Sequence, residues 1–395
     1  MDAVRNPFAP GAGTPPPELT GRDEILEKAR VTLARIRLRR SAKSLLLVGL
    51  RGVGKTVLLN RIWQVAEHEG YLAELIEVPE HRNVAELLVP SLRRILLRLD
   101  DFKNVSDKVK RAIRTLKSFV GVVKVTYRDI EIGLDIDPER GVADSGDIEH
   151  DLQDLFVSVG EAALARDTAV AIIIDELQYL QEKELSALIM AMHRVAQNQL
   201  PLVVIGAGLP QLVAMSGESK SYAERLFEFP EVGPLRNDDA IRALAEPAQR
   251  EGVRFERDAL AEILKVTQGY PYFLQEWGYH AWNQADASPI TLPVIRRTTK
   301  IATAHLDESF FRVRFDRLTP AEKRYLRAMA ELGPGQHRSG AVADILGVKV
   351  NQVGPVRSAL IRKGMVYSPQ HGDTAFTVPL FDQFMRRAMA EIPRH

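Results

Sequence analysis

Short runs of apolar residues recur along the first 235 residues of the chain. Four such runs cover 44–49, 71–78, 169–175 and 201–208, and a fifth strand is expected within 226–235. Runs of this length are typical of strands buried on both faces of a parallel sheet. Helix-length segments separate them. The pattern therefore predicts an α/β fold with a five-stranded parallel sheet, whose ligands bind at the carboxyl ends of the strands.

The same pattern divides the chain into four regions. Proline and small residues crowd the amino-terminal end and predict an extended, flexible arm, and after Pro234 the pattern is helical to about His305. A capping box formed by Thr319 and Glu322 then marks the first helix of a further unit. We expect an arm (1–18), an α/β core (19–235), a helical region (236–305) and a carboxy-terminal domain (306–395).

The stretch 79–168, between the second and third predicted strands, is longer than a single crossover requires and predicts an insertion with elements of its own. Its first half is rich in basic residues: Arg93, Arg94, Arg98, Lys103, Lys108, Lys110, Arg111, Arg114 and Lys117. Two interpretations stay open for them, a solvated helix face and a surface for nucleic acid or another partner. Residues 122–136 then alternate with the two-residue period of a hairpin.

Composition excludes several classes of function. The chain has 395 residues, 45% hydrophobic and 27% charged, which is ordinary for a folded protein. It has no cysteine, so disulfides, thiolate metal sites and cysteine nucleophiles are excluded. The longest wholly apolar runs are far shorter than the roughly 20 residues of a membrane span. We expect a soluble, cytoplasmic protein without a membrane partner, and the net charge of +1 confines any nucleic-acid binding to local patches.

A phosphate-binding motif follows the first strand. Residues 49–56 fit the GxxxxGKT pattern and stand between a predicted strand and a predicted helix. Glycines allow backbone N–H groups to surround phosphates, and the helix N-terminus adds positive potential. Lysine reaches the terminal phosphates and the threonine hydroxyl is a Mg²⁺ ligand. The predicted nucleotide-binding residues of this motif are Gly49, Gly52, Gly54, Lys55, Thr56 and Val57.

Two carboxylates, Asp175 and Glu176, end the third strand, where a buried strand tip would not carry them without a use. Successive strand residues point to opposite sides, so only one of them can face a metal ion. We expect Asp175 to bind Mg²⁺ together with Thr56, and Glu176 to polarise the attacking water. The alternative is an Asp-Glu pair that stabilises a helix N-terminus.

These motifs resemble the AAA+ superfamily, and within it the branch of origin-recognition and loader ATPases and the related STAND signalling ATPases. The resemblance covers roughly residues 19–300. Residues 19–24 are similar to the box that such proteins place against adenine, which implies contacts from Gly21 and Arg22. Gln178 in the sequence DELQ, and a GxP element ending at Pro271, favour the STAND side. The resemblance implies a P-loop AAA+ core that binds ATP, a helical lid over 236–305, and adenine contacts at Pro271.

The resemblance also implies a catalytic arginine that acts on a neighbouring subunit. Arg225 stands at the place where the superfamily offers an arginine to the γ-phosphate across a subunit interface, so a nucleotide-dependent homo-oligomer is expected. The alternative is a surface ion pair of Arg225 with Glu224 or Glu228. The fourth strand ends in Gly206-Ala207-Gly208, without the usual polar sensor residue, and only Gln211 follows to orient water. The lid lacks a second sensor arginine. Slow hydrolysis is expected.

The carboxy-terminal residues 306–395 resemble a small α+β winged helix-turn-helix domain, with three helices and a two-stranded wing. Residues 319–395 contain 11 basic and 6 acidic residues, a net charge of +5, which favours DNA binding. Base-edge contacts are expected from Asn351 and Gln352, and phosphate contacts from Arg357 and from the wing around His371. The full predicted DNA-binding set is Lys349, Asn351, Gln352, Arg357, Arg362 and Lys363. Winged helices also dock proteins, and that alternative stays open.

Three hypotheses follow from the sequence. The first is an ATP-dependent switch that binds double-stranded DNA through its winged helix; the second is a STAND-like regulator whose carboxy-terminal domain docks a protein. The third is a nucleotide-binding scaffold that never hydrolyses. The nine histidines show no paired spacing typical of metal ligands, and His193 is interpreted as packed or solvated.

Overall fold

The computed structural model describes residues 1–11, 13–80, 82–100, 106–123, 137–219, 223–370 and 372–392. The chain forms two compact units. One consists of Asp23–Val48 and Lys55–Glu231, and the other of Met1–Arg22, Gly49–Gly54 and the chain from Val232 onward. Within the described part of the chain, no helix is long and apolar enough to cross a membrane.

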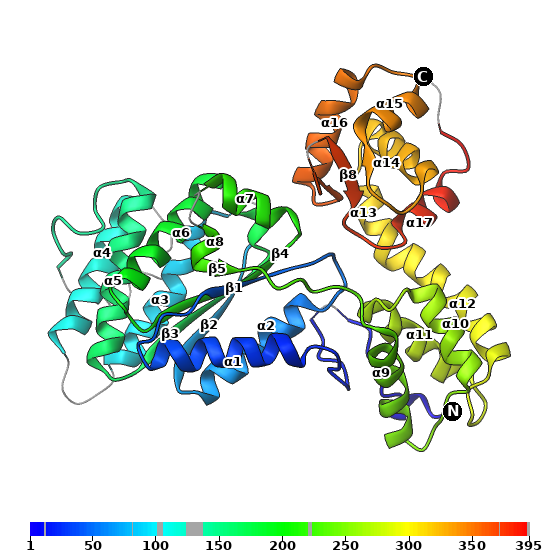
Figure 1. The fold of residues 1–395 in the computed structure, drawn as a ribbon, viewed down its shortest axis with the longest axis horizontal. Helices are drawn as coiled ribbons and strands as arrows, with labels where there is room; N and C mark the ends of the chain where they lie inside the picture. Colours follow the sequence, from blue (N-terminus) through cyan, green and yellow to red (C-terminus); the bar gives the residue numbers. More distant parts are fainter. Residues whose placement is uncertain are drawn as a thin grey trace. The chain divides into compact units, whose positions relative to one another are not determined.

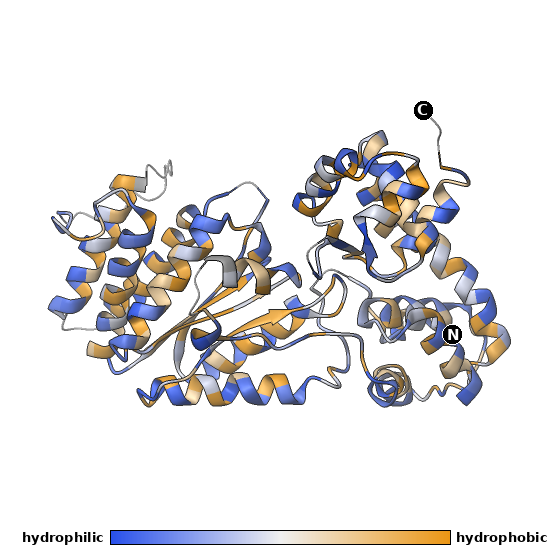
Figure 2. Ribbon diagram, turned by 45° about the horizontal axis from the view of Figure 1, so that its top comes forward, coloured by the Kyte–Doolittle hydropathy of each residue, from blue (hydrophilic) through white to orange (hydrophobic). Residues whose placement is uncertain are grey.

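The first unit is built on a parallel sheet of five strands in the order β2-β3-β4-β1-β5 (Figure 1). The strands are β1 (Ser44–Val48), β2 (Tyr71–Glu77), β3 (Ala169–Asp175), β4 (Leu202–Gly208) and β5 (Phe227–Glu228). All residues of β1, β3 and β4 are buried, as expected for strands covered on both faces. The predicted five-stranded parallel sheet is confirmed, and in Figure 2 its strands are hydrophobic along most of their length.

Helices cover both faces of this sheet (Figure 1). On one face α2 (Lys55–His68) packs against β2, β3 and β4, with α1 (Asp23–Arg37) beside it. On the other face lie α5 (Ile148–Ala165) and α6 (Glu182–Gln197). The short elements η2 (Leu177–Tyr179), α7 (Gln211–Ser219) and α8 (Ala223–Leu226) follow the carboxyl ends of β3 and β4 and precede β5. This is the doubly covered architecture predicted from the sequence.

The insertion 79–168 contains helices α3 (Val84–Asp100), α4 (Asp107–Val123) and α5. The hairpin predicted over 122–136 lies outside the described residues, except that Val122 and Val123 end α4 rather than begin a strand.

Several basic side chains of the insertion are neutralised within this unit. Arg94 forms a bidentate ion pair with Glu74, and Lys108 lies 2.6 Å from a carboxylate oxygen of Glu161. Arg111 and Arg114 both lie 3.8 Å from Glu139. Lys103 lies outside the described residues. These pairs favour the interpretation of the basic run as a solvated helix face.

The second unit begins with residues that the sequence predicted to be a flexible arm. Instead, the amino terminus donates to the carbonyl of Ala285 at 2.7 Å, and Trp282 Nε1 donates to the carbonyl of Asp2 at 2.8 Å. A short 3₁₀ turn, η1, spans Ala3–Arg5, and Phe8 is 2% exposed within the hydrophobic core of this unit. The expectation of a free arm is therefore corrected. Burial of the Phe8 ring outweighs the extended preference of the prolines around it.

Four helices form the region predicted as a lid: α9 (Asn237–Arg250), α10 (Arg257–Thr267), α11 (Pro271–Gln284) and α12 (Leu292–Leu306). The chain continues from α12 through a π-helical segment, η3 (Asp307–Phe311), into α13 (Arg312–Asp316). The predicted boundary between the lid and the carboxy-terminal domain, at residues 305–306, thus falls within a continuous run of helical turns.

The carboxy-terminal region contains α14 (Pro320–Leu332), α15 (Ser339–Leu346), α16 (Val350–Arg362) and α17 (Phe381–Ala388). Its antiparallel sheet has the order β6-β8-β7, with strands His337–Arg338, Asp373–Phe376 and Val366–Tyr367. The capping box predicted for Thr319 and Glu322 is present at the start of α14. Three helices with a β-hairpin after the third are the arrangement of a winged helix-turn-helix; β6 and α17 add to the predicted elements.

Candidate nucleotide site and carboxy-terminal surface

The hydroxyl of Thr56 and the carboxylate of Asp175 meet at the carboxyl end of the sheet. Thr56 is the second residue of α2, and its Oγ1 donates to Asp175 Oδ2 at 2.6 Å. The other carboxylate oxygen, Oδ1, accepts from the backbone N–H of Glu176 at 2.8 Å. The sequence expected these two side chains to bind one Mg²⁺ ion, and the fold brings them together. A hydroxyl and a carboxylate form an all-oxygen donor set that suits Mg²⁺.

Burial changes the protonation behaviour of Asp175, which is 4% exposed. Desolvation raises the pKa of this carboxyl, and the nearby charge of Glu176 adds to the effect. The hydrogen bond from Thr56 and the positive charge of Lys55 oppose the rise without cancelling it. A buried carboxylate with this balance gains from a cation that binds it.

Glu176 has an unusual backbone conformation and a single side-chain partner among its described neighbours. Its φ and ψ of 58° and 36° lie in the left-handed region, which costs a non-glycine residue about 1 kcal/mol or more. Its carboxylate oxygen Oε2 accepts a short hydrogen bond from Gln178 Nε2. Gln178 is buried, and its carbonyl oxygen accepts from the backbone N–H of Leu209 at 3.0 Å, directly after β4. One glutamine amide therefore links Glu176 to the end of the neighbouring strand.

The glycines at the end of β4 leave room for side chains of η2, the turn after β3. A Cβ atom at Gly208 would lie 3.0 Å from the amide oxygen of Gln178, and one at Gly206 would overlap the Leu177 side chain. Gln178 thus places a polar side chain at this end of β4, where the strand itself has none. Gln211, which the sequence expected to orient water, is the first residue of α7, and its Oε1 is buried.

The phosphate-binding loop, Gly49–Gly54, connects β1 to α2 along the chain. Gly52 and Gly54 have φ angles of 80° and 92°, which L-residues rarely adopt. A Cβ at Gly49 would overlap the carbonyl oxygen of Val232. The glycines at these three predicted positions are therefore required by backbone geometry. Lys55 and Val57, the remaining members of the motif, lie in the first turn of α2, where Lys55 is 7% exposed.

Gly21 and Arg22, predicted to contact adenine, are involved in main-chain positioning. Arg22 is buried, and its guanidinium donates to the carbonyls of Val53 at 3.1 Å and Gly233 at 2.5 Å. Burial lowers the pKa of Arg22, while the nearby carboxylate of Asp239 opposes that effect. Gly21 has a φ of 70° and no room for a side chain beside Asp239. The guanidinium of Arg22 thus holds the main chain at Val53, in the phosphate-binding loop, next to that at Gly233.

Two further contacts tie the loop to the lid and to the carboxy-terminal region, within the second unit. The backbone N–H of Tyr272 donates to the carbonyl of Gly52 at 3.2 Å, next to Pro271 at the first position of α11. The backbone N–H of Arg51 donates to the carbonyl of Thr377 at 3.0 Å. Thr377 directly follows β8. The segment that would bind phosphates is therefore in contact with the first turn of a lid helix and with the predicted wing.

Arg225 is exposed at the end of α8. The alternative interpretation paired it with Glu224 or Glu228, but Glu228 pairs with Lys28 at 2.5 Å and the Glu224 carbonyl accepts from Lys43. Among the residues described on either side of the 220–222 gap, no ion pair to Arg225 is present.

The six residues predicted to bind DNA separate into two groups. Lys349, Asn351, Gln352 and Arg362 are exposed on or next to α16. Arg357 instead donates to Thr374 Oγ1 at 2.7 Å, Ser368 Oγ at 2.6 Å and the Asp373 carbonyl at 2.8 Å, so it fixes the wing to the helix. His371 lies outside the described residues.

Lys363 also has an internal role. Its ammonium group lies 2.7 Å from Glu322 Oε2 and donates to the carbonyl of Arg317 at 3.0 Å. Burial by itself would raise the pKa of Glu322, but the hydrogen bonds from Lys363 and from Thr319 outweigh it and lower that pKa. Of the six predicted DNA-binding residues, Arg357 and Lys363 are therefore already engaged in contacts within this region.

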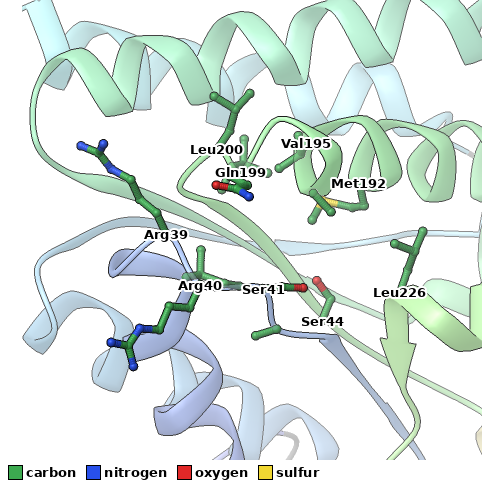
Figure 3. A pocket seen from close by; sticks show the side chains of 13 residues that line it. Arg39, Arg40, Ser41, Ser44, Met192, Val195, Gln199, Leu200 and Leu226 are labelled. Carbon is green, nitrogen blue, oxygen red and sulfur yellow. The ribbon is translucent and has the colours of Figure 1, made fainter.

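The pocket shown in Figure 3 lies at the other end of the sheet. It is lined by Ser44 and Leu202, the first residues of β1 and β4, together with Arg39, Met192 and Leu226. Asp175 and Gly208 are the last residues of their strands. Because the strands are parallel, this pocket is separated from the carboxylates by the length of the sheet and is not the phosphate site.

Comparisons with known families agree with this geometry. Residues 18–205 match the family model described as an AAA ATPase domain, and residues 308–385 match one described as a domain of unknown function. The chain is also similar to an uncharacterized HTH-type transcriptional regulator of Methanocaldococcus jannaschii. The two are 23% identical over 346 residues, which cover 84% of this chain and 79% of the relative.

Two solved structures are similar to this chain. The Walker-type ATPase of Pyrococcus abyssi is similar with a TM-score of 0.54 and 18% identity, over 93% of this chain and 96% of that chain. The Orc1 protein of Aeropyrum pernix, solved in complex with DNA, gives a TM-score of 0.47 and 17% identity, over 94% and 93% of the two chains. The family match over residues 18–205 and the shared fold support ATPase activity.

Proposed function

We propose that this ATPase is a slow molecular switch, which couples the state of its bound nucleotide to the binding of double-stranded DNA by the carboxy-terminal winged helix. The contact from Arg51 to Thr377 carries the proposal, since it joins the phosphate-binding loop to the wing at 3.0 Å. Three further parts of the proposal concern the nucleotide, the hydrolytic step and the DNA surface.

The nucleotide is MgATP, bound by the loop Gly49–Gly54, Lys55 and Thr56. The oxygen pair of Thr56 and Asp175 would hold Mg²⁺, which when bound neutralises charge on the phosphates. Lys55 contributes a buried positive charge beside Asp175. Pro271 begins the helix that contacts Gly52, and it is proposed to line the adenine site with Gly21 and Arg22 behind the loop.

Hydrolysis depends on Glu176 as general base. Gln178 donates to Oε2, so Oε1 is the oxygen that would take the proton of the attacking water. We attribute slow turnover to the fourth strand, which ends in Gly206-Ala207-Gly208 without a polar side chain. Slow turnover suits a switch that must hold its state.

Nucleotide state reaches the wing through the loop itself. A bound triphosphate draws the backbone N–H groups of a P-loop toward its oxygens. The N–H of Arg51 donates to the carbonyl of Thr377, so phosphate binding and the wing contact use the same short segment. Burial and the adjacent phenol of Tyr367, on β7, raise the pKa of Tyr270 in the lid, which places another wing residue near the start of α11.

The proposed DNA surface is the exposed part of α16 and the residue before it, with Asn351 and Gln352 toward base edges and Lys349 and Arg362 toward phosphates. The net charge of +5 over 319–395 supports it. The printed name of the Methanocaldococcus relative, an HTH-type transcriptional regulator, supports the same class of ligand.

A second function has one observation in its favour. Arg357 and Lys363 make internal contacts, which reduces the cations available to DNA. A STAND-like regulator, whose winged helix docks a protein, would not need those cations. In both functions, Arg225 is proposed to act across the interface of a homo-oligomer.

Fluorescence anisotropy of a labelled duplex separates the two. The full chain is titrated onto the duplex with ATP, with ADP and without nucleotide, at several ionic strengths. Under the first function, affinity depends on the nucleotide and falls steeply with salt. Absence of duplex binding in every nucleotide state would contradict it and favour protein docking.

A further inference from the structure

Three side chains that the nucleotide site does not use converge in the lid. Glu276 and His280 lie one helical turn apart on α11, and His305 lies in the last turn of α12. The carboxylate oxygen Glu276 Oε2 is 3.5 Å from His280 Nε2 and 3.4 Å from His305 Nδ1. One ligand atom from each of the three residues lies within 4.8 Å of the other two. Both helices belong to the same unit.

The convergent atoms lack hydrogen bonds. Glu276 is 1% exposed, and its Oε2 is buried without a hydrogen-bond partner in the described structure; the same holds for His280 Nε2. A buried carboxylate oxygen without a donor is costly, so its persistence calls for a compensating charge. The His305 side chain is 50% exposed, so the cluster is open to solvent on that side.

The separations fit a metal ion better than direct hydrogen bonds. Zinc binds imidazole nitrogen and carboxylate oxygen at about 2.0–2.2 Å, so two ligands in a tetrahedral arrangement lie about 3.4 Å apart. A direct charge-assisted hydrogen bond would bring nitrogen and oxygen to about 2.8 Å. The distances of 3.4 and 3.5 Å from Glu276 Oε2 match the separation of ligands of one metal ion, and the three ligand atoms all lie within 4.8 Å of one another.

We infer that Glu276, His280 and His305 form a binding site for a divalent transition-metal ion of the zinc class. Two imidazoles and one carboxylate select such an ion over Mg²⁺ and Ca²⁺, which prefer oxygen ligands. The open side at His305 leaves a coordination position for water. The spacing of histidine pairs along the chain does not reveal this site. The sequence signal that was available is Glu-x-x-x-His on α11.

Tyr272 supports the carboxylate from outside the cluster. Its hydroxyl donates to Glu276 Oε1 at 3.0 Å, which leaves Oε2 to face the histidines. Partners of this kind orient metal ligands. The backbone N–H of Tyr272 donates to the carbonyl of Gly52. Tyr272 therefore contacts both Glu276 of this cluster and the phosphate-binding loop.

The test uses the full chain, freed of metal with a chelator, without nucleotide or Mg²⁺. Isothermal titration with Zn²⁺ should give one equivalent per chain, and Co²⁺ should give the intense visible absorption of a tetrahedral site. His305→Ala, His280→Ala and Glu276→Gln should weaken Zn²⁺ binding by more than the roughly 10–100-fold expected of Tyr272→Phe. The exposed His68, at the end of α2, provides the matched control, His68→Ala, with unchanged binding.

Thermal unfolding keeps the test decisive if Glu276→Gln fails to fold, because His305 is half exposed and its substitution should leave the fold intact. Zn²⁺ should raise the melting temperature of the wild type and not that of His305→Ala. Equal Zn²⁺ affinity in wild type and His305→Ala, or no Zn²⁺ bound by the wild type, would overturn the inference. ATP binding, measured separately, would be unaffected by that outcome.

Discussion

Gln178 holds the carboxylate of Glu176 by a direct hydrogen bond, and its own carbonyl is held by the N–H of Leu209 at 3.0 Å. Glu176, the proposed base of the hydrolytic step, is thereby connected to the end of β4, where Gly208 provides no side chain. Glu176 has a positive φ, and its backbone is therefore strained. A hydrogen bond to a charged carboxylate is worth about 1.5–3 kcal/mol, which is enough to hold Glu176 in that conformation.

We expect Gln178→Ala to lower the rate of ATP hydrolysis about 10–100-fold, because a misplaced catalytic group costs this much. ATP affinity should not change, since the Gln178 amide hydrogen-bonds Glu176 and Leu209. Steady-state phosphate release and equilibrium nucleotide binding measure the two effects. Gln211→Ala is the matched control; a larger loss in that variant would restore the role that the sequence gave to Gln211.

Replacing Gly208 with asparagine tests the same contact from the other side. Gly208→Asn places a polar side chain at this strand end, yet its Cβ would press on the Gln178 amide, so hydrolysis should fall rather than rise. In a Gln178→Ala background the same change should cost less, because the crowded side chain is gone. The double-mutant cycle of hydrolysis rates measures this coupling, and strictly additive effects would argue against it.

Asp175→Asn should abolish Mg²⁺-dependent ATP binding while it stabilises the nucleotide-free fold at neutral pH. The pKa of Asp175 is higher in the folded than in the unfolded chain, so its charge destabilises the fold when the pH is above that raised value. This gain in stability should appear as a higher urea concentration at the midpoint of unfolding. It should vanish as the pH falls through the raised pKa toward the ordinary carboxyl range. Urea denaturation across pH gives this comparison, and a gain that persists in acid would contradict the assignment.

Arg225→Ala should reduce hydrolysis only where subunits assemble. At low protein concentration the variant and the wild type should hydrolyse ATP equally slowly, and they should separate as concentration rises. An arginine supplied to a neighbouring active site raises the rate of hydrolysis by about 10³-fold or more. The exposed Arg61, which contacts only Gln64 in the described structure, gives the control variant Arg61→Ala. A loss that does not depend on concentration would count against a role between subunits.

Two arginines of α16 should differ in what they support. Arg362→Ala should weaken duplex binding and reduce its salt dependence, with no change in stability. Arg357→Ala should instead lower the free energy of unfolding by about 1–3 kcal/mol, because it leaves polar groups of the wing without their donor. Anisotropy and urea denaturation are measured on both variants. If Arg362→Ala binds the duplex like the wild type, α16 is not the DNA-facing helix.

The main features of the core could be predicted from local pattern. Runs of consecutive apolar residues specify buried parallel strands because both faces of the sheet are covered, and all five predicted strands are present. The phosphate-binding loop and its glycines were also predictable, because the motif combines strand, tight turn and helix start within a few residues. The capping box at Thr319 is local in the same way.

The amino-terminal segment, the insertion and the wing were less accessible to such reasoning. Proline content indicated a free arm, yet Phe8 is buried in the lid core, and this burial depends on residues more than 250 positions away. Arg357 and Lys363 are basic, as expected of residues that contact DNA. Only the positions of Thr374 and Glu322 in the fold show that both side chains make internal contacts.

What the sequence determined is everything governed by neighbours along the chain: strand burial, helix starts, the phosphate loop and the carboxylates after β3. The tertiary structure decided which distant groups meet. Gln178 meets Leu209, Arg51 meets Thr377, and Glu276 meets His305, each pair separated by more than 25 residues along the chain. Hydrogen bonds and ligand sets depend on distances of a few ångströms, and only the packing of helices and strands against one another sets these distances.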